Sequence, residues 1–308
     1  MILVTGATGL VGTYLLSVLS KKEDRIRAMY RTDQKLEHAK SVFLNIHPKD
    51  ASSKFENIEW IKGDITDVVS LEAAFKNITV VYHCAALISF DPADYQKLRK
   101  VNIEGTANIV NQCILHNVKT LCHVSSIATM GKGIEESLID ESTEWNAEKK
   151  HSVYAITKYG AEMEVWRGSQ EGVKVIIVNP GIIVGAGFFN SGSGYFFKKV
   201  NRGLTYYTTG TTGFVAASDV ALCMVTLVEK KVYNDRFILT AENWSFQKFF
   251  ISIANALQKP APKKSVKKYW MQLGVVYYNL KYFFTKKKKK IIFGYRQKCF
   301  FKRSVRQF

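Results

Sequence analysis

The stretch that decides the fold is Met1-Ile2-Leu3-Val4-Thr5-Gly6-Ala7-Thr8-Gly9-Leu10-Val11-Gly12. It joins a short apolar run, typical of a buried strand, to a glycine-rich turn and then to a helical pattern. The pyrophosphate of a dinucleotide needs close approach to the backbone, which glycine permits, and free amides at a helix N-terminus. A tight strand-to-helix turn without a ligand is the alternative interpretation. No GK[ST] follows the glycines, which argues against a nucleotide-hydrolysing site.

Short β-branched runs alternate with longer helical patterns through the first 180 residues. Strands are predicted at Ile2–Val4, Ile26–Tyr30, Ile58–Ile61, Val80–His83, Thr120–Ser125 and Val173–Val178, and helices at Leu10–Lys21, Val68–Phe75, Tyr95–His116 and Tyr154–Gln170. This alternation predicts an α/β fold with a doubly wound parallel sheet and right-handed crossovers. After Pro180 a segment rich in Gly, Ser and aromatic residues precedes a strand at Arg236–Thr240 and a helix at Ser245–Leu257. We expect this part to form a small C-terminal substrate lobe.

The basic charge is concentrated at one end of the chain. The 308 residues include 44 Lys and Arg against 26 Asp and Glu, for a net charge of +18. Residues 260–308 hold 15 of the basic residues and no acidic one, so the first 259 residues carry a net charge of only +3. The body of the protein is therefore not a polyanion-binding surface, and we expect no nucleic-acid partner.

Cysteine usage and hydropathy indicate a cytoplasmic protein. The five cysteines are far apart, with no CxxC pair and no metal-ligand spacing to His, so we expect reduced thiols and no metal site. Because an apolar run starts at the first residue, we expect no secretory signal. No stretch reaches the roughly 18 uncharged apolar residues of a spanning helix. The nearest candidate, Tyr269–Phe284, is interrupted by Lys281.

Arg31 bears on the choice of cofactor. It ends the second predicted strand, where dinucleotide-binding proteins read the adenosine ribose. A guanidinium can bind a 2′-phosphate in a bidentate manner, whereas a carboxylate would repel that phosphate. NADP(H) is therefore favoured. An ordinary exposed Arg31 is the alternative, and Asp33 can place a carboxylate nearby, so NAD(H) stays open.

Tyr154 and Lys158 stand at positions i and i+4 of a predicted helix, on one face. A tyrosine titrates near pH 10, and an adjacent ammonium is expected to lower the pKa of Tyr154. Such a tyrosine can give a proton to a carbonyl oxygen as hydride arrives at the carbon. An unremarkable surface pair is the alternative. However, Ser125 and Ser126 end a strand 28 residues earlier, where parallel sheets place their sites, and a hydroxyl there can orient a carbonyl.

Taken together, these residues resemble the extended short-chain dehydrogenase/reductases, which include the NAD-dependent epimerase/dehydratases, dihydroflavonol reductases and 3β-hydroxysteroid dehydrogenases. Eight motifs match in order over roughly 220 residues. They are Gly6-x-x-Gly9-x-x-Gly12, Gly63-Asp64-Ile65, His83-Cys84-Ala85-Ala86, Val101-Asn102-x-x-Gly105-Thr106, Ser125-Ser126, the Tyr154/Lys158 pair, Asn179 to Gly185, and Phe214-Val215-x-x-x-Asp219-Val220-Ala221.

The resemblance implies a role for each matching position. Tyr154 is the acid–base, Lys158 holds the nicotinamide ribose and tunes Tyr154, and Ser126 orients the carbonyl, with Ser125 as the alternative. The cofactor residues are Gly6, Thr8, Gly9, Leu10 and Val11 at the diphosphate, Asp64 and Ile65 at the adenine, Ala85 and Ala86 at the ribose, and Pro180, Gly181 and Ile182 at the nicotinamide. Asn102 serves structure or a water relay. His83 and His123 are expected to be packed, and His151 is a candidate for contact with substrate.

The resemblance also divides the chain. Residues 1–184 form an NADP-binding Rossmann domain to which 213–240 return, and residues 185–212 and 241–285 form the substrate lobe. Residues 286–308 form a basic tail. A contact of this tail with a membrane surface is the less favoured interpretation, a helix of the lobe with a solvated basic end is another, and a third is a frame-shifted remnant after the lysine run at 286–290.

The function predicted is an NAD(P)H-dependent oxidoreductase that interconverts a carbonyl and a secondary alcohol on a small apolar molecule. The aromatic residues predicted to make an apolar pocket are Phe188, Phe189, Tyr195, Phe196, Phe197, Tyr206 and Tyr207. The alternative is a sugar-nucleotide epimerase/dehydratase with bound NAD, in which Arg202 and Arg236 meet the substrate diphosphate. A non-catalytic NADP-sensing protein is a second alternative. The resemblance also suggests a homodimer.

Overall fold

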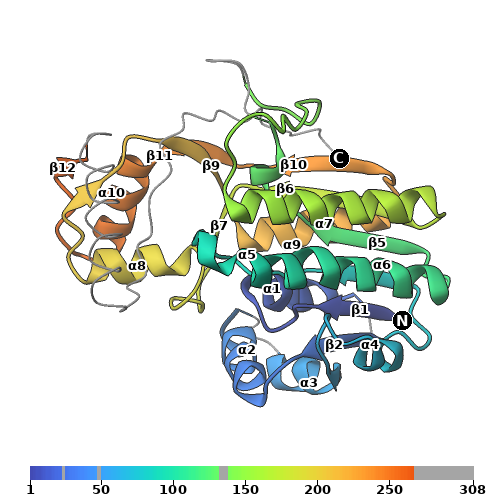
Figure 1. Ribbon diagram of the computed structural model, residues 1–308. Coiled ribbons are helices and arrows are strands. Elements are labelled where there is room, and N and C mark those ends of the chain that lie inside the picture. The colour runs from blue at the N-terminus through green and yellow to red at the C-terminus, as the bar shows by residue number, and fades with distance from the viewer. Residues whose placement is uncertain (23–24, 47–49, 132–137, 267–308) are drawn as a thin grey trace.

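The computed structural model describes residues 1–22, 25–46, 50–131 and 138–266, and a parallel seven-stranded sheet forms its centre (Figure 1). The strand order is β10-β6-β5-β4-β1-β2-β3, with every neighbouring pair parallel. The strands are β1 Ile2–Thr5, β2 Ile26–Tyr30, β3 Glu59–Lys62, β4 Val80–His83, β5 Thr120–Val124, β6 Lys174–Pro180 and β10 Asp235–Leu239. This is the Rossmann order with one strand added at an edge, so the predicted doubly wound sheet is confirmed.

Helices cover both faces of this sheet because alternate strand residues point to opposite sides. One face buries Val4 and Cys122 with α1 (Leu10–Leu19), α2 (Asp33–Ile46), α3 (Ala51–Glu56) and α9 (Ala217–Glu229). The other face buries Leu3 and Leu121 with α4 (Val68–Ala74), α6 (Gly105–Leu115) and α7 (Val153–Gln170). Because all seven strands are parallel, their carboxyl ends lie together at one edge, which is where such sheets bind ligands.

The single helix predicted over Tyr95–His116 is interrupted. After the 3₁₀ turn η1 (Pro92–Asp94), the structure has α5 (Tyr95–Leu98), then a π-helical turn η2 (Arg99–Glu104), and then α6. Asn102 lies in this wider turn, where its Oδ1 accepts from the Leu87 amide at 2.8 Å and its Nδ2 donates to the Leu87 carbonyl at 3.0 Å. The π turn therefore fixes the segment that follows β4.

A smaller lobe follows Pro180 (Figure 1). A three-stranded sheet has the order β11-β9-β7, built from β7 (Ile182–Val184), β9 (Thr211–Ala216) and β11 (Glu242–Ser245). Next to it lie α8 (Gly194–Asn201), α10 (Phe246–Ala256) and the short pair of β8 (Tyr206–Tyr207) and β12 (Lys264–Ser265). Their shared core is mainly aromatic and includes Phe196, Phe214, Phe246, Phe249 and Phe250.

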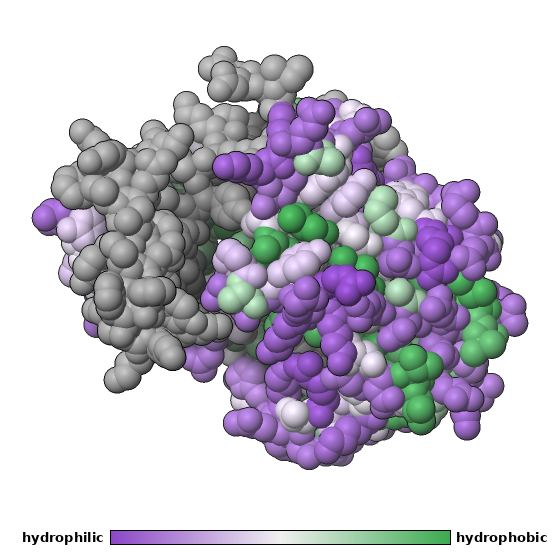
Figure 2. All heavy atoms as spheres, viewed as in Figure 1, coloured by the Kyte–Doolittle hydropathy of each residue, from purple (hydrophilic) through white to green (hydrophobic). Residues whose placement is uncertain are grey.

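Over the described part of the chain, none of the helices combines the length and the apolarity needed to cross a membrane. On the face shown in Figure 2, hydrophilic residues predominate and apolar residues form small separate patches. Cys84, Cys113, Cys122 and Cys223 are free thiols. The predictions made for Tyr269–Phe284 and for the tail at 286–308 lie outside the described residues.

Candidate active site

The three glycines of the first turn have different roles. Gly6 has φ +67°, and a Cβ there would come within 2.7 Å of the Ala85 Cα. A Cβ on Gly12 would come within 2.7 Å of the Ala7 Cα. At Gly9, in contrast, a Cβ would meet only the Gly6 carbonyl oxygen, at 3.3 Å. Gly6 and Gly12 are thus required by the packing of the protein itself, whereas Gly9 leaves open space in front of the turn.

This open space lies at the start of α1. Gly9 is the N-cap of that helix, and no side chain caps it, so the first amides and the positive end of the helix dipole face outward. The position suits a bound phosphate group. Of the other residues predicted to contact cofactor, Ala85 and Ala86 follow β4 beside Gly6, and Pro180 ends β6. The chain therefore fits a dinucleotide along the carboxyl edge of the sheet.

Arg31 ends up beside Asp64, another predicted cofactor residue, with the Arg31 Nη1 3.6 Å from the Asp64 Oδ2. The Arg31 side chain is 51% exposed, so its guanidinium is accessible to a ligand. Burial works against ionisation of Asp64, but donors on Thr66 and the Arg31 guanidinium outweigh it and lower the pKa of the carboxyl. A second cation, Lys35, also faces this pair, and partial burial followed by the Arg31 charge lowers its pKa. Two cations and one carboxylate leave a net positive charge at the end of β2.

Tyr154 and Ser126 are brought together by α7 and by the turn that follows β5. The Ser126 hydroxyl accepts from the Ala128 amide at 3.1 Å, caps η3 (Ile127–Thr129), and lies near enough to the Tyr154 hydroxyl to act on its pKa in the lowering direction. The Phe90 ring packs against Tyr154 with centroids 5.3 Å apart. This is the geometry expected of a hydroxyl pair that holds a carbonyl oxygen.

The predicted effect of Lys158 on Tyr154 is wrong for this structure. Tyr154 is partly exposed as a residue, but burial of its hydroxyl raises its pKa to about 12. The effect that lowers this pKa comes from Ser126. Lys158 instead points into the protein, where its Nζ donates to the Val124 carbonyl at 2.8 Å and lies 3.4 Å from the His123 Nε2. Burial lowers the pKa of Lys158 to about 8, against the opposing effect of Glu162.

The two neighbouring serines face different partners. The Ser125 hydroxyl donates to the Glu162 Oε2 at 2.6 Å, which commits it to a buried carboxylate. Ser126 is the one that reaches Tyr154. The geometry therefore favours Ser126 over Ser125 as the group that orients a carbonyl.

Comparison with known proteins identifies the family of the chain. The model of the NAD dependent epimerase/dehydratase family matches residues 2–238. The chain belongs to this family.

Curated relatives of the chain include both reductases and epimerases. A protein described as a putative dihydroflavonol 4-reductase from Synechocystis is 26% identical over 85% of this chain and 74% of its own length. A UDP-glucose 4-epimerase from Vibrio cholerae is 29% identical over 84% of this chain and 76% of its own length. Family members of this kind are enzymes, and this chain is an NAD(P)-dependent enzyme of the extended short-chain dehydrogenase/reductase type.

Solved structures share the fold. The yeast methylglyoxal/isovaleraldehyde reductase Gre2, complexed with NADPH, has a TM-score of 0.71 at 19% identity, over 85% of this chain and 84% of its own. The protein gox2253 has a TM-score of 0.77 at 24% identity, over 94% of this chain and 84% of its own.

Other residues singled out from the sequence make contacts within the protein itself. His83 is fully buried between the Thr5 and Thr106 hydroxyls, at 2.7 and 3.0 Å, and its ring lies 5.0 Å from that of His123. Asn102 also donates to the Thr157 hydroxyl at 3.2 Å, which is a structural contact. His151 stacks on Trp145 at 3.6 Å between ring centroids.

Arg236 is not available to a substrate diphosphate, contrary to the role considered for it. Its side chain is only 18% exposed, and its Nη1 lies 3.5 Å from the Glu162 Oε1. Its Nε and Nη2 donate to the carbonyl oxygens of Glu141 and Thr143, at 2.9 and 3.2 Å. Arg202, the other candidate, is exposed at the C-terminus of α8.

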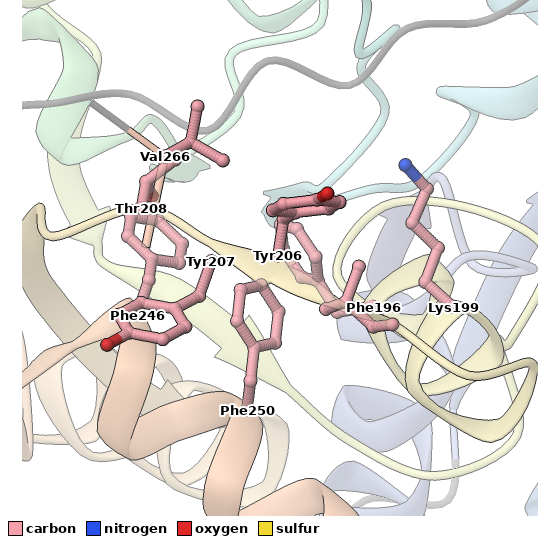
Figure 3. A pocket seen from close by; sticks show the side chains of 9 residues that line it. Phe196, Lys199, Tyr206, Tyr207, Thr208, Phe246, Phe250 and Val266 are labelled. Carbon is pink, nitrogen blue, oxygen red and sulfur yellow. The ribbon is translucent and has the colours of Figure 1, made fainter. Parts of the chain in front are cut away.

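The small lobe contains a cavity of about 80 Å³ (Figure 3). Its lining comes from α8, β8, α10 and the residues beside them: Phe196, Lys199, Leu204, Tyr206, Tyr207, Thr208, Phe246, Phe250 and Val266. Three of the predicted aromatic residues line it, whereas Phe188 is buried against the His38 ring. Ser126, Tyr154 and Lys158 are not part of its lining.

Sequence reasoning missed Lys35 and Glu162. Lys35 lies four residues after Arg31, outside the glycine turn, where a second cation for the phosphate would be expected from sequence. Glu162 continues the Tyr154 and Lys158 spacing by one more helical turn, so the i+4 repeat was a usable signal.

Proposed function

We propose that this protein is an NADP(H)-dependent reductase that converts a carbonyl group of an apolar substrate to a secondary alcohol, and catalyses the reverse oxidation. The observation that carries the proposal is the proximity of the Ser126 and Tyr154 hydroxyls at the end of β5, with Lys158 one turn further along the helix that carries Tyr154. The reductases among the relatives agree with this assignment.

The residues divide the work of proton transfer. The Ser126 and Tyr154 hydroxyls hold the substrate oxygen, and Tyr154 gives its proton to that oxygen as negative charge develops there. Because burial raises the pKa of Tyr154 to about 12, the phenol is protonated at neutral pH and is ready to act as the acid in reduction. We assign the nicotinamide ribose to the N–H groups of Lys158 that remain after its hydrogen bond to the Val124 carbonyl. A bound reduced nicotinamide supplies the hydride.

The preference for NADP(H) is supported by the two cations at the end of β2. Arg31 and Lys35 lie close enough that the first lowers the pKa of the second, and a 2′-phosphate would relieve their mutual repulsion. An NAD-binding member would instead gain from a carboxylate that accepts the ribose hydroxyls. Asp64, the carboxylate nearest to Arg31, already accepts from the Thr66 amide and hydroxyl, both at 2.9 Å.

We also propose that residues 185–212 and 241–266 form the side of the site that binds substrate. Their aromatic core and the exposed Phe90 and Phe189 favour apolar molecules. The rival epimerase interpretation needs cations for a substrate diphosphate, and Arg236 is engaged with Glu162. A homodimer and a cytoplasmic location stay predictions from the sequence.

The proposal is tested by turnover of NADPH with a panel of apolar aldehydes and ketones. The wild-type protein should oxidise NADPH with at least one of them. Tyr154→Phe should lower kcat by about a thousandfold while NADPH binding, followed by nicotinamide fluorescence, changes little. Tyr159→Phe, on the same helix but stacked on Trp145, is the matched control and should keep its activity. Equal activity of the Tyr154 and Tyr159 variants would rule out this mechanism.

A further inference from the structure

Glu162 is a buried carboxylate near the site, and several side chains hydrogen-bond to it. It lies on α7, one turn beyond Lys158, and it is fully buried. Its Oε2 accepts three hydrogen bonds, from the Ser125 hydroxyl at 2.6 Å, the Thr129 hydroxyl at 2.8 Å and the Asn179 amide at 2.9 Å. Three donors on one oxygen are what an ionised carboxylate attracts.

These partners surround the turn that carries Ser126. Ser125 precedes it, and the Thr129 hydroxyl lies 2.8 Å from both the Glu162 Oε2 and the Ser126 carbonyl oxygen, which share its one proton. Asn179, on β6, also reaches the Ser126 carbonyl, at 3.3 Å. The carboxylate therefore connects α7 to the turn from both sides and to the neighbouring strand.

Three side chains of α7 reach the end of β5, each one helical turn after the last. Tyr154 contacts Ser126, Lys158 contacts His123 and Val124, and Glu162 contacts Ser125. A shift of α7 by even one ångström would change all of these contacts together, because the helix is rigid. Glu162 has the most hydrogen bonds of the three, so its contacts hold the other two in place.

Glu162 also acts electrostatically on Lys158. The Lys158 ammonium is enclosed by His123 of β5, His83 of β4, Cys84 after β4 and Glu162 of its own helix. Glu162 is the carboxylate in that set and works to keep the lysine charged despite its burial. Arg236 of β10, 3.5 Å from the Glu162 Oε1, is the balancing cation on the far side.

We propose that Glu162 is a positioning residue for the reaction: its carboxylate fixes the Ser126 turn against α7 and places a negative charge one helical turn from Lys158. The inference rests on the proposed function for the roles of Ser126, Tyr154 and Lys158. The proposal has two parts: an effect of the Glu162 charge on Lys158, and an effect of the Glu162 hydrogen bonds on the position of Ser126. Two substitutions of Glu162 distinguish these parts.

The charge effect is measured by NADPH binding between about pH 7 and about pH 10. Wild-type affinity should weaken as the pH rises through about 8, where Lys158 loses its proton. Glu162→Gln should move this midpoint down by about 1 pH unit, because the opposing charge is gone. Glu162→Asp and Ser125→Ala, which keep a carboxylate, should leave the midpoint in place. A midpoint unchanged in Glu162→Gln, or no pH dependence in the wild type, overturns the charge effect.

The geometric effect is measured by kinetics. Glu162→Asp shortens the side chain and should lower kcat about tenfold or more, with KM and NADPH affinity close to wild type, because Ser126 is no longer aligned with Tyr154. Wild-type kcat in a folded Glu162→Asp protein overturns this part, and it can be measured even if Glu162→Gln does not fold. The binding experiment needs no carbonyl turnover and can be repeated with NADH, so failure of the reductase proposal leaves the charge effect testable.

Discussion

At the scale of single residues, the carboxyl edge of the sheet contains two kinds of charged side chain. Glu162 is fully buried and Arg236 is mostly buried, and both are engaged by contacts within the protein, so they hold the structure together. Arg31 is half-exposed and has one long contact with Asp64, at 3.6 Å. An exposed charged group such as Arg31, with one long contact, can still bind a ligand.

Arg31 should therefore decide the cofactor. We expect Arg31→Gln to weaken NADPH binding about tenfold, since one charge-assisted contact to the 2′-phosphate is lost, and to leave NADH binding nearly unchanged. Lys62→Gln is the matched control, because Lys62 is equally exposed nearby but pairs with Asp33 at 3.2 Å. Fluorescence titration with both cofactors measures the effect. An equal loss for NADPH and NADH would show that Arg31 does not recognise the phosphate.

His83 makes stability depend on pH. Burial, and secondarily the Lys158 charge, lower its pKa from 6.5 to about 3. The unfolded chain therefore binds more protons between these two values, so stability is full above about pH 6.5 and falls as the pH decreases. By about pH 5 this residue alone should cost about 2 kcal/mol. The pKa of His123 is lowered in the same sense, by burial first and then by Lys158 and His83, and adds to the loss.

Urea unfolding at about pH 7 and about pH 5 tests this linkage. His83→Gln keeps hydrogen-bonding groups for Thr5 and Thr106 but does not titrate, so its stability should fall less on acidification. The same acid loss in wild type and variant would show that other groups cause it.

At the scale of elements, sequence patterns predicted the central strands because each is a short, nearly continuous apolar run bounded by turns. The predictions were weaker where tertiary contacts decide. Helix α2 is largely polar and buries only Ala39, Val42 and Phe43, so its apolar pattern is faint. The strands of the small sheet are three to six residues long and pair across distant segments, as β7 does with β9. The π turn at Asn102 depends on its bonds to Leu87, which sequence does not show.

In the site, too, sequence patterns predicted some features, and tertiary contacts decide the others. Tyr154, Lys158 and Ser126 stand in spaced motifs, and the structure brings them together at one strand end. The partners of Lys158 could not be predicted, because its direction is set by the Val124 carbonyl and not by its position in the helix. For the same reason, the sequence suggested a lowered pKa for Tyr154, whereas burial raises it.

The strand-to-helix element at the N-terminus supports a paired prediction. Gly9→Ala should fold with nearly normal stability, because its Cβ would meet one atom at 3.3 Å, yet lose NADPH affinity about tenfold or more as the methyl group enters the phosphate space. Gly12→Ala should lose about 3 kcal/mol of stability, because its Cβ would press against the backbone of Ala7. Urea unfolding and fluorescence titration distinguish the two. Equal stability losses would contradict the division of roles among these glycines.

At the scale of the whole molecule, the candidate cofactor site draws on residues from Gly6 to Ile182. Most of them follow the carboxyl ends of β1, β2, β3, β4 and β6, which are five of the seven strands of the sheet. A ligand along this edge contacts segments that are far apart in the chain and that separate when the sheet unfolds. Binding at this edge is therefore coupled to the stability of the whole sheet.

This coupling predicts a thermal shift. At a concentration about 100 times its Kd, NADPH should raise the free energy of unfolding by about 2.7 kcal/mol, which for a chain of this size is a rise in Tm of about 5 °C. NADH at the same concentration should give a smaller shift, because the Arg31 and Lys35 charges then meet no phosphate. Gly9→Ala, matched for concentration, should show little shift with either. A larger shift with NADH would overturn the NADP preference and favour the epimerase interpretation, and no shift with either cofactor would mean that this edge is not a dinucleotide site.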